Sequence, residues 1–225
     1  MASPTDRMAA GSGFGALAKA DELKKRLWFT VGALIIYRLG TYLPLPGINP
    51  GALADIFSQQ SSGILGMFDM FSGGALGRMT IFALNIMPYI TASIIMQLMT
   101  AIVPSLEALK KDGEGGRKTI NQYTRYLTVL LASVQGYGIA VALEAASGVV
   151  GDPGMFFRLT TVVTLVGGTL FLMWLGEQIT SRGVGNGISL IIFSGIVAEL
   201  PTALAGTLEL GRTGALSSIL IVLLF

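Results

Sequence analysis

The chain has no cysteine and no histidine, and only 12% of its 225 residues are charged. Without thiols or imidazoles it has no disulfide, no cysteine nucleophile, no histidine base and no metal site built from these ligands. Soluble domains carry about 25% charged residues, so the composition disfavours a soluble fold. The net charge of +2 is too small for nucleic-acid binding to be the main function. These absences exclude most common enzyme mechanisms, and we expect no cofactor and no metal.

What the chain has instead is apolar sequence: 52% of its residues are hydrophobic and its mean hydropathy is +0.69. Five apolar runs bounded by charge, Gly or Pro are candidate membrane spans. They cover residues 27–45, 75–99, 123–143, 155–175 and 188–205. A sixth run begins near Leu216 and stops at Phe225, which predicts a piece of a longer protein, truncated in its sixth helix. An interfacial helix is the alternative, but the run SILIVLLF lacks a polar face.

The apolar stretch of residues 63–99 is interrupted by Gly73 and Gly74. Its front piece, residues 64–71, is too short to cross a hydrocarbon core of about 30 Å at about 1.5 Å per helical residue. Irregular backbone that faces lipid would leave its polar groups unpaired, so the break requires a protein-lined cavity. The sequence therefore predicts a pathway through the membrane that contains a short segment.

Basic residues gather on one side of the membrane if the spans alternate in direction. They precede the first span, lie around the loop after the second, and follow the fourth: Lys19, Lys24, Lys25, Arg26, Lys110, Lys111, Arg117, Lys118, Arg125 and Arg182. Cytoplasmic loops are enriched in Lys and Arg, so the amino terminus is predicted to be cytoplasmic. The tail is polar and rich in Gly and Ala, unlike a cleavable signal peptide. The piece 64–71 then lies on the outer side.

Glycine-rich segments in this chain do not predict nucleotide binding. The segment GEGGRKT, residues 113–119, lacks the spacer of a P-loop, and GVGNG, residues 183–187, has no dinucleotide fold around it. Close helix packing in lipid explains the 30 glycines better.

Few ionisable residues lie within or at the ends of the spans. We interpret Arg38 and Glu199 as residues near outer helix ends that snorkel or pair, in preference to a transport role. Glu177 and Arg182 flank a short inner turn and are predicted to cap helix ends there.

Three isoleucines occupy unusual positions. Ile86 and Ile90 are four residues apart, so a helix would place them on one face. Pro88 between them removes a backbone donor, as expected of a bent helix that lines a cavity. Ile192 lies near the Gly-rich start of the fifth span. Periodicity alone favours lipid-facing or core positions for these residues over a place in a pore.

Four motifs resemble the SecY family of protein-translocation channels. The most specific are FSGGALGRMTIFALNIMPYITASIIMQLM, residues 71–99, and MWLGEQITSRGVGNGISLIIF, residues 173–193. YRLGTYLPLPGI, residues 37–48, and EGGRKTINQYTRY, residues 114–126, support them. The resemblance covers nearly all of residues 23–201, in order and at consistent spacing.

The resemblance implies an all-α membrane protein: a polytopic helical bundle forming the first half of the SecY inverted-repeat fold, with a broken second helix. Residues 1–26 would be a cytoplasmic tail with an amphipathic start, and residues 27–205 the five-helix half of the channel. Residues 206–225 would be an outer loop and the start of the truncated sixth helix. The protein would be the pore-forming subunit that passes unfolded preproteins across the bacterial inner membrane and inserts membrane proteins into it.

The resemblance also implies a pore ring. Ile86, Ile90 and Ile192 would be this half's share of an apolar constriction at the waist of an hourglass pore. A narrow apolar constriction dewets and so blocks ions, and alkyl side chains form no hydrogen bonds that would hold a passing peptide.

By the same resemblance, residues 63–74 would be a plug in the outer funnel, hinged at Gly73 and Gly74. Glycine tolerates the φ changes that opening requires. The apolar side chains of the plug would be Ile64, Leu65, Met67, Phe68, Met70 and Phe71.

The second and third spans resemble one side of a lateral gate, through which signal peptides and membrane helices leave for the lipid. Thr91 and Gln135 would pair across the closed gate. The implied partners are SecE, SecG, SecA and the ribosome, with no nucleic-acid binding beyond ribosomal contact. A cytoplasmic basic loop would suit anionic lipid headgroups as well; it contains Lys110, Lys111, Arg117 and Lys118.

One residue departs from the resemblance, because the family usually has Gly where this chain has Asn85. Helical spacing of about 100° per residue would turn Asn85 away from Ile86 and toward a neighbouring helix. The sequence therefore predicts that Asn85→Gly leaves the ion leak through the closed channel unchanged.

Two other functions compete with the channel. A secondary transporter also has discontinuous helices, but transporters place polar groups at the midplane, where this chain has Ile86, Met87 and Ile90. A non-conducting scaffold would have no use for a segment of half the membrane depth.

Overall fold

The structure is a computed structural model that describes residues 21–60, 69, 72–146 and 148–212. Within these residues the secondary structure is helical, and the β structure is limited to two isolated bridges. The helices are α3 (Asp21–Gly40), α4 (Pro50–Gln60), α6 (Met87–Ile102), α7 (Pro104–Lys111), α8 (Glu114–Ala145), α9 (Met155–Arg182) and α10 (Gly187–Arg212). The predicted all-α fold class is confirmed.

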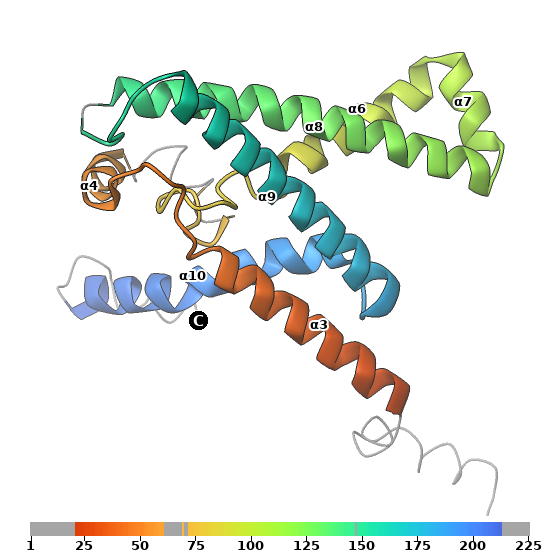
Figure 1. The fold of residues 1–225 in the computed structure, drawn as a ribbon. Coiled ribbons are helices and arrows are strands. Elements are labelled where there is room, and N and C mark those ends of the chain that lie inside the picture. The colour runs from red at the N-terminus through yellow and green to blue at the C-terminus, as the bar shows by residue number, and fades with distance from the viewer. Residues whose placement is uncertain (1–20, 61–68, 70–71, 147, 213–225) are drawn as a thin grey trace, which may run out of the picture.

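The helices form a bundle with two distinct ends (Figure 1). Helix α8 packs against α6 and α9, and α9 packs against α3 and α10. The start of α3, the corner between α7 and α8, and the turn between α9 and α10 lie toward one end, whereas α4 and the α8–α9 connection lie toward the other (Figure 1). This arrangement brings the basic segments to one end, in agreement with the alternation of spans that the sequence predicts.

Three helices within the described residues are long and apolar enough to cross a membrane: Glu114–Ala145, Met155–Arg182 and Gly187–Gly206. They contain the third, fourth and fifth predicted spans. Helix α10 runs on to Arg212, so residues 206–212 continue the fifth helix and are not the predicted outer loop. The first predicted span, residues 27–45, is displaced, because α3 begins at Asp21 and ends at Gly40.

The second predicted span, residues 75–99, is wrong as a continuous helix. Residues 73–86 form a series of turns, and α6 begins only at Met87. Two left-handed residues, Met79 at φ 44° and Asn85 at φ 49°, interrupt helical geometry in these turns. Pro88 lies in the first turn of α6, where a missing backbone donor costs nothing. Helix α7 is bent from α6 by 99°, and by length and composition the pair is either a broken span or a re-entrant loop.

The segment between α3 and α4, residues 41–49, is hydrogen-bonded to two other parts of the chain. Its first half pairs with the turns before α6, and its second half pairs with the α8–α9 connection. The bonds are Leu45 N to Met79 O (3.0 Å), Ile81 N to Leu43 O (3.0 Å), Asn49 N to Val149 O (2.8 Å) and Gly151 N to Gly47 O (3.2 Å). These bonds connect the irregular part of the chain to the longest helices.

Candidate functional site

The candidate site is built around residues 72–86, which we call the turn segment. Its side chains are largely buried, and Ala75 and Ile86 have no exposed surface. Irregular backbone at membrane depth is tolerated only where protein or a water-filled cavity surrounds it. Contacts with residues 41–49 and burial among the helices meet this requirement, and they place the turn segment inside the bundle.

The three predicted ring isoleucines belong to one hydrophobic cluster. Ile86 is fully enclosed, whereas Ile90 and Ile192 are half-buried at the edge of the cluster. The enclosing side chains come from α3, the turn segment, α9 and α10: Ala33, Tyr37, Phe82, Leu172, Leu175, Ile179 and Ile191. The structure thus brings the three isoleucines into one cluster with residues from helices that are far apart in the sequence.

Sequence reasoning missed Ile188, which packs against the same cluster. Ile188 and Ile192 are four residues apart, as are Ile86 and Ile90. The same helical spacing could therefore have identified Ile188.

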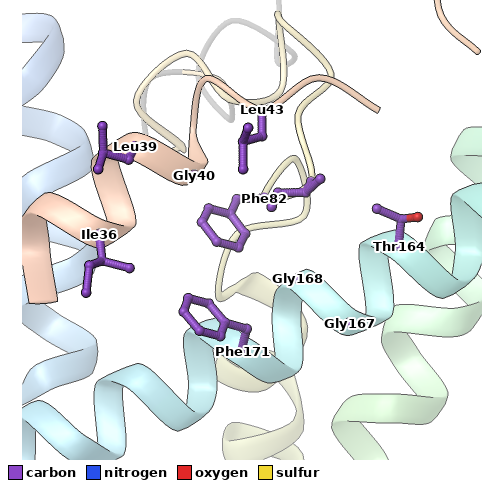
Figure 2. A pocket seen from close by; sticks show the side chains of 10 residues that line it. Ile36, Leu39, Gly40, Leu43, Phe82, Thr164, Gly167, Gly168 and Phe171 are labelled. Carbon is purple, nitrogen blue, oxygen red and sulfur yellow. The ribbon is translucent and has the colours of Figure 1, made fainter. Parts of the chain in front are cut away.

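An aromatic stack joins the turn segment to α3 and α9. The Phe82 ring lies 6.2 Å from that of Tyr37 and 5.9 Å from that of Phe171. The stack borders an apolar cavity of about 410 Å³ between α3 and α9, where Phe82 lies close to Leu43 and Phe171 (Figure 2). A Cβ atom at Gly168 would overlap the carbonyl oxygen of Ile81, so this glycine lets α9 approach the turn segment closely.

Asn85 is buried, with 3% of its surface exposed, but the helical argument for its orientation was wrong. It precedes α6 and has a φ of 49°. Asparagine is among the few non-glycine residues that adopt this left-handed conformation readily. Its side chain lies near the Tyr37 phenol, whose hydroxyl donates to Ser72 O at 3.4 Å. Backbone conformation explains why this position suits either Gly or Asn.

The two predicted gate residues line a common cavity of about 530 Å³ between the turn segment, α6 and α8. The expected hydrogen bond between Thr91 and Gln135 is not formed among the described residues. The Thr91 hydroxyl donates instead to the Met87 carbonyl of its own helix, at 3.1 Å. A threonine on a helix satisfies its hydroxyl in this way without any partner across the cavity.

The four predicted basic residues lie at the corner formed by α7 and the start of α8, at one edge of the molecule (Figure 1). All four are exposed. Lys110 and Arg117 line a cavity of about 250 Å³ with side chains of α6 and α8. Lys111 forms an ion pair with Glu107 at 2.7 Å, one turn earlier on α7. Lys118 follows Arg117 on α8.

The predicted helix cap at Glu177 is wrong. Its carboxylate binds Arg125 with two short contacts, 2.7 Å to Oε1 and 2.6 Å to Oε2, and so joins α9 to α8. The two residues are 52 positions apart, and no local pattern indicates the pair.

Arg38 and Glu199 both lie beside the Gly73–Gly74 turn. Arg38 donates to the Gly73 carbonyl at 3.4 Å. Of the two predicted alternatives for Arg38, snorkelling or pairing, the structure favours pairing. A Cβ atom at Gly74 would lie 3.1 Å from Glu199 Oε1. Both glycines have positive φ, 64° and 78°, as a hinge or tight turn of glycines allows.

The apolar residues predicted for the plug lie outside the described residues: Ile64, Leu65, Met67, Phe68, Met70 and Phe71. Of residues 63–74, the structure describes Asp69 and residues 72–74. Within the described part of the chain, no group of three or more acidic side chains is placed to hold a metal ion.

Comparison with known proteins places this arrangement in a family. The SecY family model matches residues 80–225. "Protein translocase subunit SecY" of Rickettsia bellii (strain RML369-C) is 57% identical over 207 residues, which cover 90% of this chain and 48% of that protein. The protein of the same name from Escherichia coli (strain K12) is 56% identical over 205 residues, covering 90% and 46% respectively. The chain spans about half the length of the curated relatives it matches.

Solved structures share the fold. One described as a protein conducting channel matches with a TM-score of 0.57 at 20% identity, over 77% of this chain and 36% of the other. Sec61 in a canine ribosome-channel complex from the endoplasmic reticulum matches with the same score, identity and coverage. Sequence and structure agree, and the chain belongs to the SecY family.

Proposed function

We propose that this chain forms the first half of the pore-forming subunit of a protein-translocation channel in a bacterial inner membrane. The observation that carries the proposal is the buried turn segment, which leads directly into the isoleucine cluster. Relatives named as translocase subunits cover 90% of the chain and support this assignment. Its substrates would be unfolded preproteins and membrane-protein segments, and its amino terminus would be cytoplasmic. The subunit itself would not be an enzyme.

In this proposal Ile86, Ile90 and Ile192 are half of an apolar ring. Ile90 and Ile192 keep exposed surface that a second half can face, while Ile86 is enclosed behind them. An apolar constriction excludes water and ions, yet it offers a sliding peptide no hydrogen bond to break. The ring would therefore seal the pore without holding its substrate.

Residues 63–74 would be the plug, and Gly73 and Gly74 its hinge. The positive φ of both glycines supports the hinge, because glycine moves between left- and right-handed conformations at little cost. Displacement of the plug would open the outer funnel.

The cavity lined by Thr91 and Gln135 would belong to the lateral gate. A volume of about 530 Å³ between α6 and α8 can accept apolar side chains of a signal peptide. The Thr91 hydroxyl is satisfied within α6, so separation of α6 from a facing helix would break no strong bond at this position.

The partners we propose are SecE, SecG, and either SecA or the ribosome at the cytoplasmic face. The basic corner of α7 and α8 would contact anionic lipid headgroups, and it is open to those partners as well. The secondary-transporter alternative has less support. The cluster around Ile86 is apolar, and the ion pairs Arg125–Glu177 and Arg158–Glu144 join helices outside that cluster.

The proposal is tested by deletion of residues 68–74 in the complete channel complex, reconstituted in planar bilayers. We expect a several-fold increase in resting ion conductance, because the deletion removes the glycine hinge and three of the six apolar plug side chains, Phe68, Met70 and Phe71. Deletion of residues 8–14, of equal length but in the amino-terminal tail, is the matched control and should leave conductance unchanged. Equal conductance of both deletions and the parent complex would favour the scaffold.

A further inference from the structure

Four charged side chains surround the Gly73–Gly74 turn, and we call them the hinge cluster. Arg38 comes from α3, Asp69 and Arg78 flank the turn itself, and Glu199 comes from α10. Two positive and two negative groups balance, so the cluster requires no external counter-ion. Arg78 is exposed, and the other three residues are half-buried.

Both arginines bind a single carbonyl group. Arg38 Nη1 donates to Gly73 O at 3.4 Å, and Arg78 Nη2 donates to the same oxygen at 3.0 Å. The Arg78 guanidinium also lies 4.5 Å from the centre of the Tyr42 ring. Hydrogen bonds from a charged donor are stronger than neutral ones. The Gly73 carbonyl is therefore fastened to α3 and to the turn segment at once.

Asp69 closes the turn from within. Its carboxylate Oδ1 accepts hydrogen bonds from the Gly77 amide at 2.7 Å and the Ser72 hydroxyl at 3.3 Å, and its carbonyl accepts one from the Gly74 amide at 3.0 Å. The Ser72 oxygen in turn accepts the Leu76 amide at 3.1 Å. These internal hydrogen bonds fix the conformation of the turn, so contacts with the neighbouring helices position the turn as a whole.

Helix α10 also approaches the turn closely. A Cβ atom at Gly73 would lie 3.1 Å from Cα of Gly195, and one at Gly74 would lie 2.9 Å from Arg78 Nη2 and 3.1 Å from Glu199 Oε1. Gly195 and Glu199 are one helical turn apart, so the same face of α10 provides the close backbone and the negative charge. The turn is held between α3 and α10.

From these contacts we infer that Arg38, Arg78 and Glu199 are positioning residues for the hinge. Arg38 bonds the Gly73–Gly74 turn to α3, and Gly195 and Glu199 bring α10 close to it, so a movement of α3 must carry the turn along or break this bond, and a movement of α10 removes the close contact. The inference rests on the proposed function only in its last step, in which the position of the hinge sets how tightly the resting channel excludes ions.

The position of the turn can be followed with a single reporter thiol. The chain has no cysteine, and Ala75, directly after the turn, has no exposed surface, so Ala75→Cys introduces one thiol that reacts only when the turn opens and leaves the hydrogen bonds of Asp69 and Ser72 in place. The complete complex, purified in detergent and with cysteines of its other parts replaced, is treated with a water-soluble maleimide. We expect Arg38→Gln and Arg78→Gln each to accelerate labelling about tenfold, since local opening becomes easier.

Further variants separate positioning from general stability. Glu199→Gln keeps the side-chain length, so it remains testable if loss of an arginine prevents assembly, and it should accelerate labelling by a smaller factor. Arg78→Lys retains a charged donor and should restore slow labelling. Arg182→Gln removes an exposed arginine at the far end of α9 and is the matched control. Labelling rates in all three glutamine variants of the hinge cluster that equal the control would overturn the inference.

Resting conductance of the same variants tests the last step. An increase in Arg38→Gln and Arg78→Gln, but not in Arg182→Gln, supports both the hinge cluster and the channel. Faster labelling with unchanged conductance would support the cluster and contradict the hinge's role in the proposed channel. Failure of the inference and failure of the proposed function therefore give different results.

Discussion

The hairpin of α8 and α9 and the turn segment, residues 72–86, satisfy their polar groups in different ways. In the hairpin the backbone is hydrogen-bonded within each helix, and hydroxyls such as those of Thr124, Thr128 and Ser133 donate to carbonyls one turn earlier. In the turn segment, backbone groups pair with residues 43 and 45, and with arginines of α3 and of the segment itself. The backbone of the hairpin is therefore satisfied within its own helices, whereas the turn segment also depends on its surroundings.

This difference predicts where the molecule is sensitive to substitution. A change on the hairpin removes the contacts of one side chain, and its helical hydrogen bonds remain. A change that separates the turn segment from α3 or α9 exposes backbone groups that have no alternative partner in lipid, and each such group is expensive.

The largest effect is expected where α9 touches the turn segment. Gly168→Ala would place a methyl group against the Ile81 carbonyl, and overpacking of this kind costs about 3 kcal/mol. The neighbouring Gly167 has nothing within 4 Å of its Cβ position, so Gly167→Ala should be neutral or stabilising by up to about 1 kcal/mol. Thermal unfolding of the purified complex measures both. Equal loss in the two variants would contradict the close approach of α9 to the turn segment.

An intermediate effect is expected at the two ion pairs of the hairpin. Glu144 binds Arg158 at 2.6 Å and the Gly154 amide at 2.9 Å, and its side chain is only 9% exposed. The Arg125–Glu177 pair is more exposed, and exposed pairs contribute little. Glu144→Gln should therefore lower the unfolding temperature by a few degrees and Glu177→Gln by less. The reverse order would show that the Arg125–Glu177 pair, at the other end of the hairpin, contributes more to stability than the Arg158–Glu144 pair.

The smallest effect is expected at Asn85, within the turn segment. Asn85→Gly and Asn85→Ala both remove the amide group, so their difference reports the cost of φ 49° for a residue with a Cβ. Alanine should be less stable than glycine by about 1 kcal/mol, measured by thermal unfolding of the complex. Ion conductance of Asn85→Gly should equal that of the parent. No difference between Gly and Ala would contradict the left-handed conformation.

Local sequence patterns predicted several features of the fold. The third, fourth and fifth spans follow from uninterrupted apolar runs, and the break follows from Gly73 and Gly74, because glycine pairs permit positive φ values that other residues resist. The start of α6 was misplaced by twelve residues, from about Ala75 to Met87. The apolar letters of residues 75–86 resemble a helix, yet burial in the bundle and pairing with residues 43 and 45 stabilise turns there.

In the candidate site, too, some features follow from the sequence and others depend on tertiary contacts. The spacing of Ile86 and Ile90 indicated a shared face, but enclosure of Ile86 by residues of α3, α9 and α10 depends on contacts more than 40 residues apart. Arg38 and Glu199 were recognisable as unusual charges, whereas their common neighbour, the Gly73–Gly74 turn, was not predictable from either position.

By itself, the sequence determined that this is a helical membrane protein, that its basic segments share one end, and that a glycine pair breaks its second apolar stretch. These properties depend on composition, on segment length and on local φ preferences, which the chain carries before it folds. Only the tertiary structure decided where α6 begins, which acid Arg125 binds, and which helices hold the turn. Those outcomes depend on backbone and charged groups finding partners inside the bundle, because lipid offers them none.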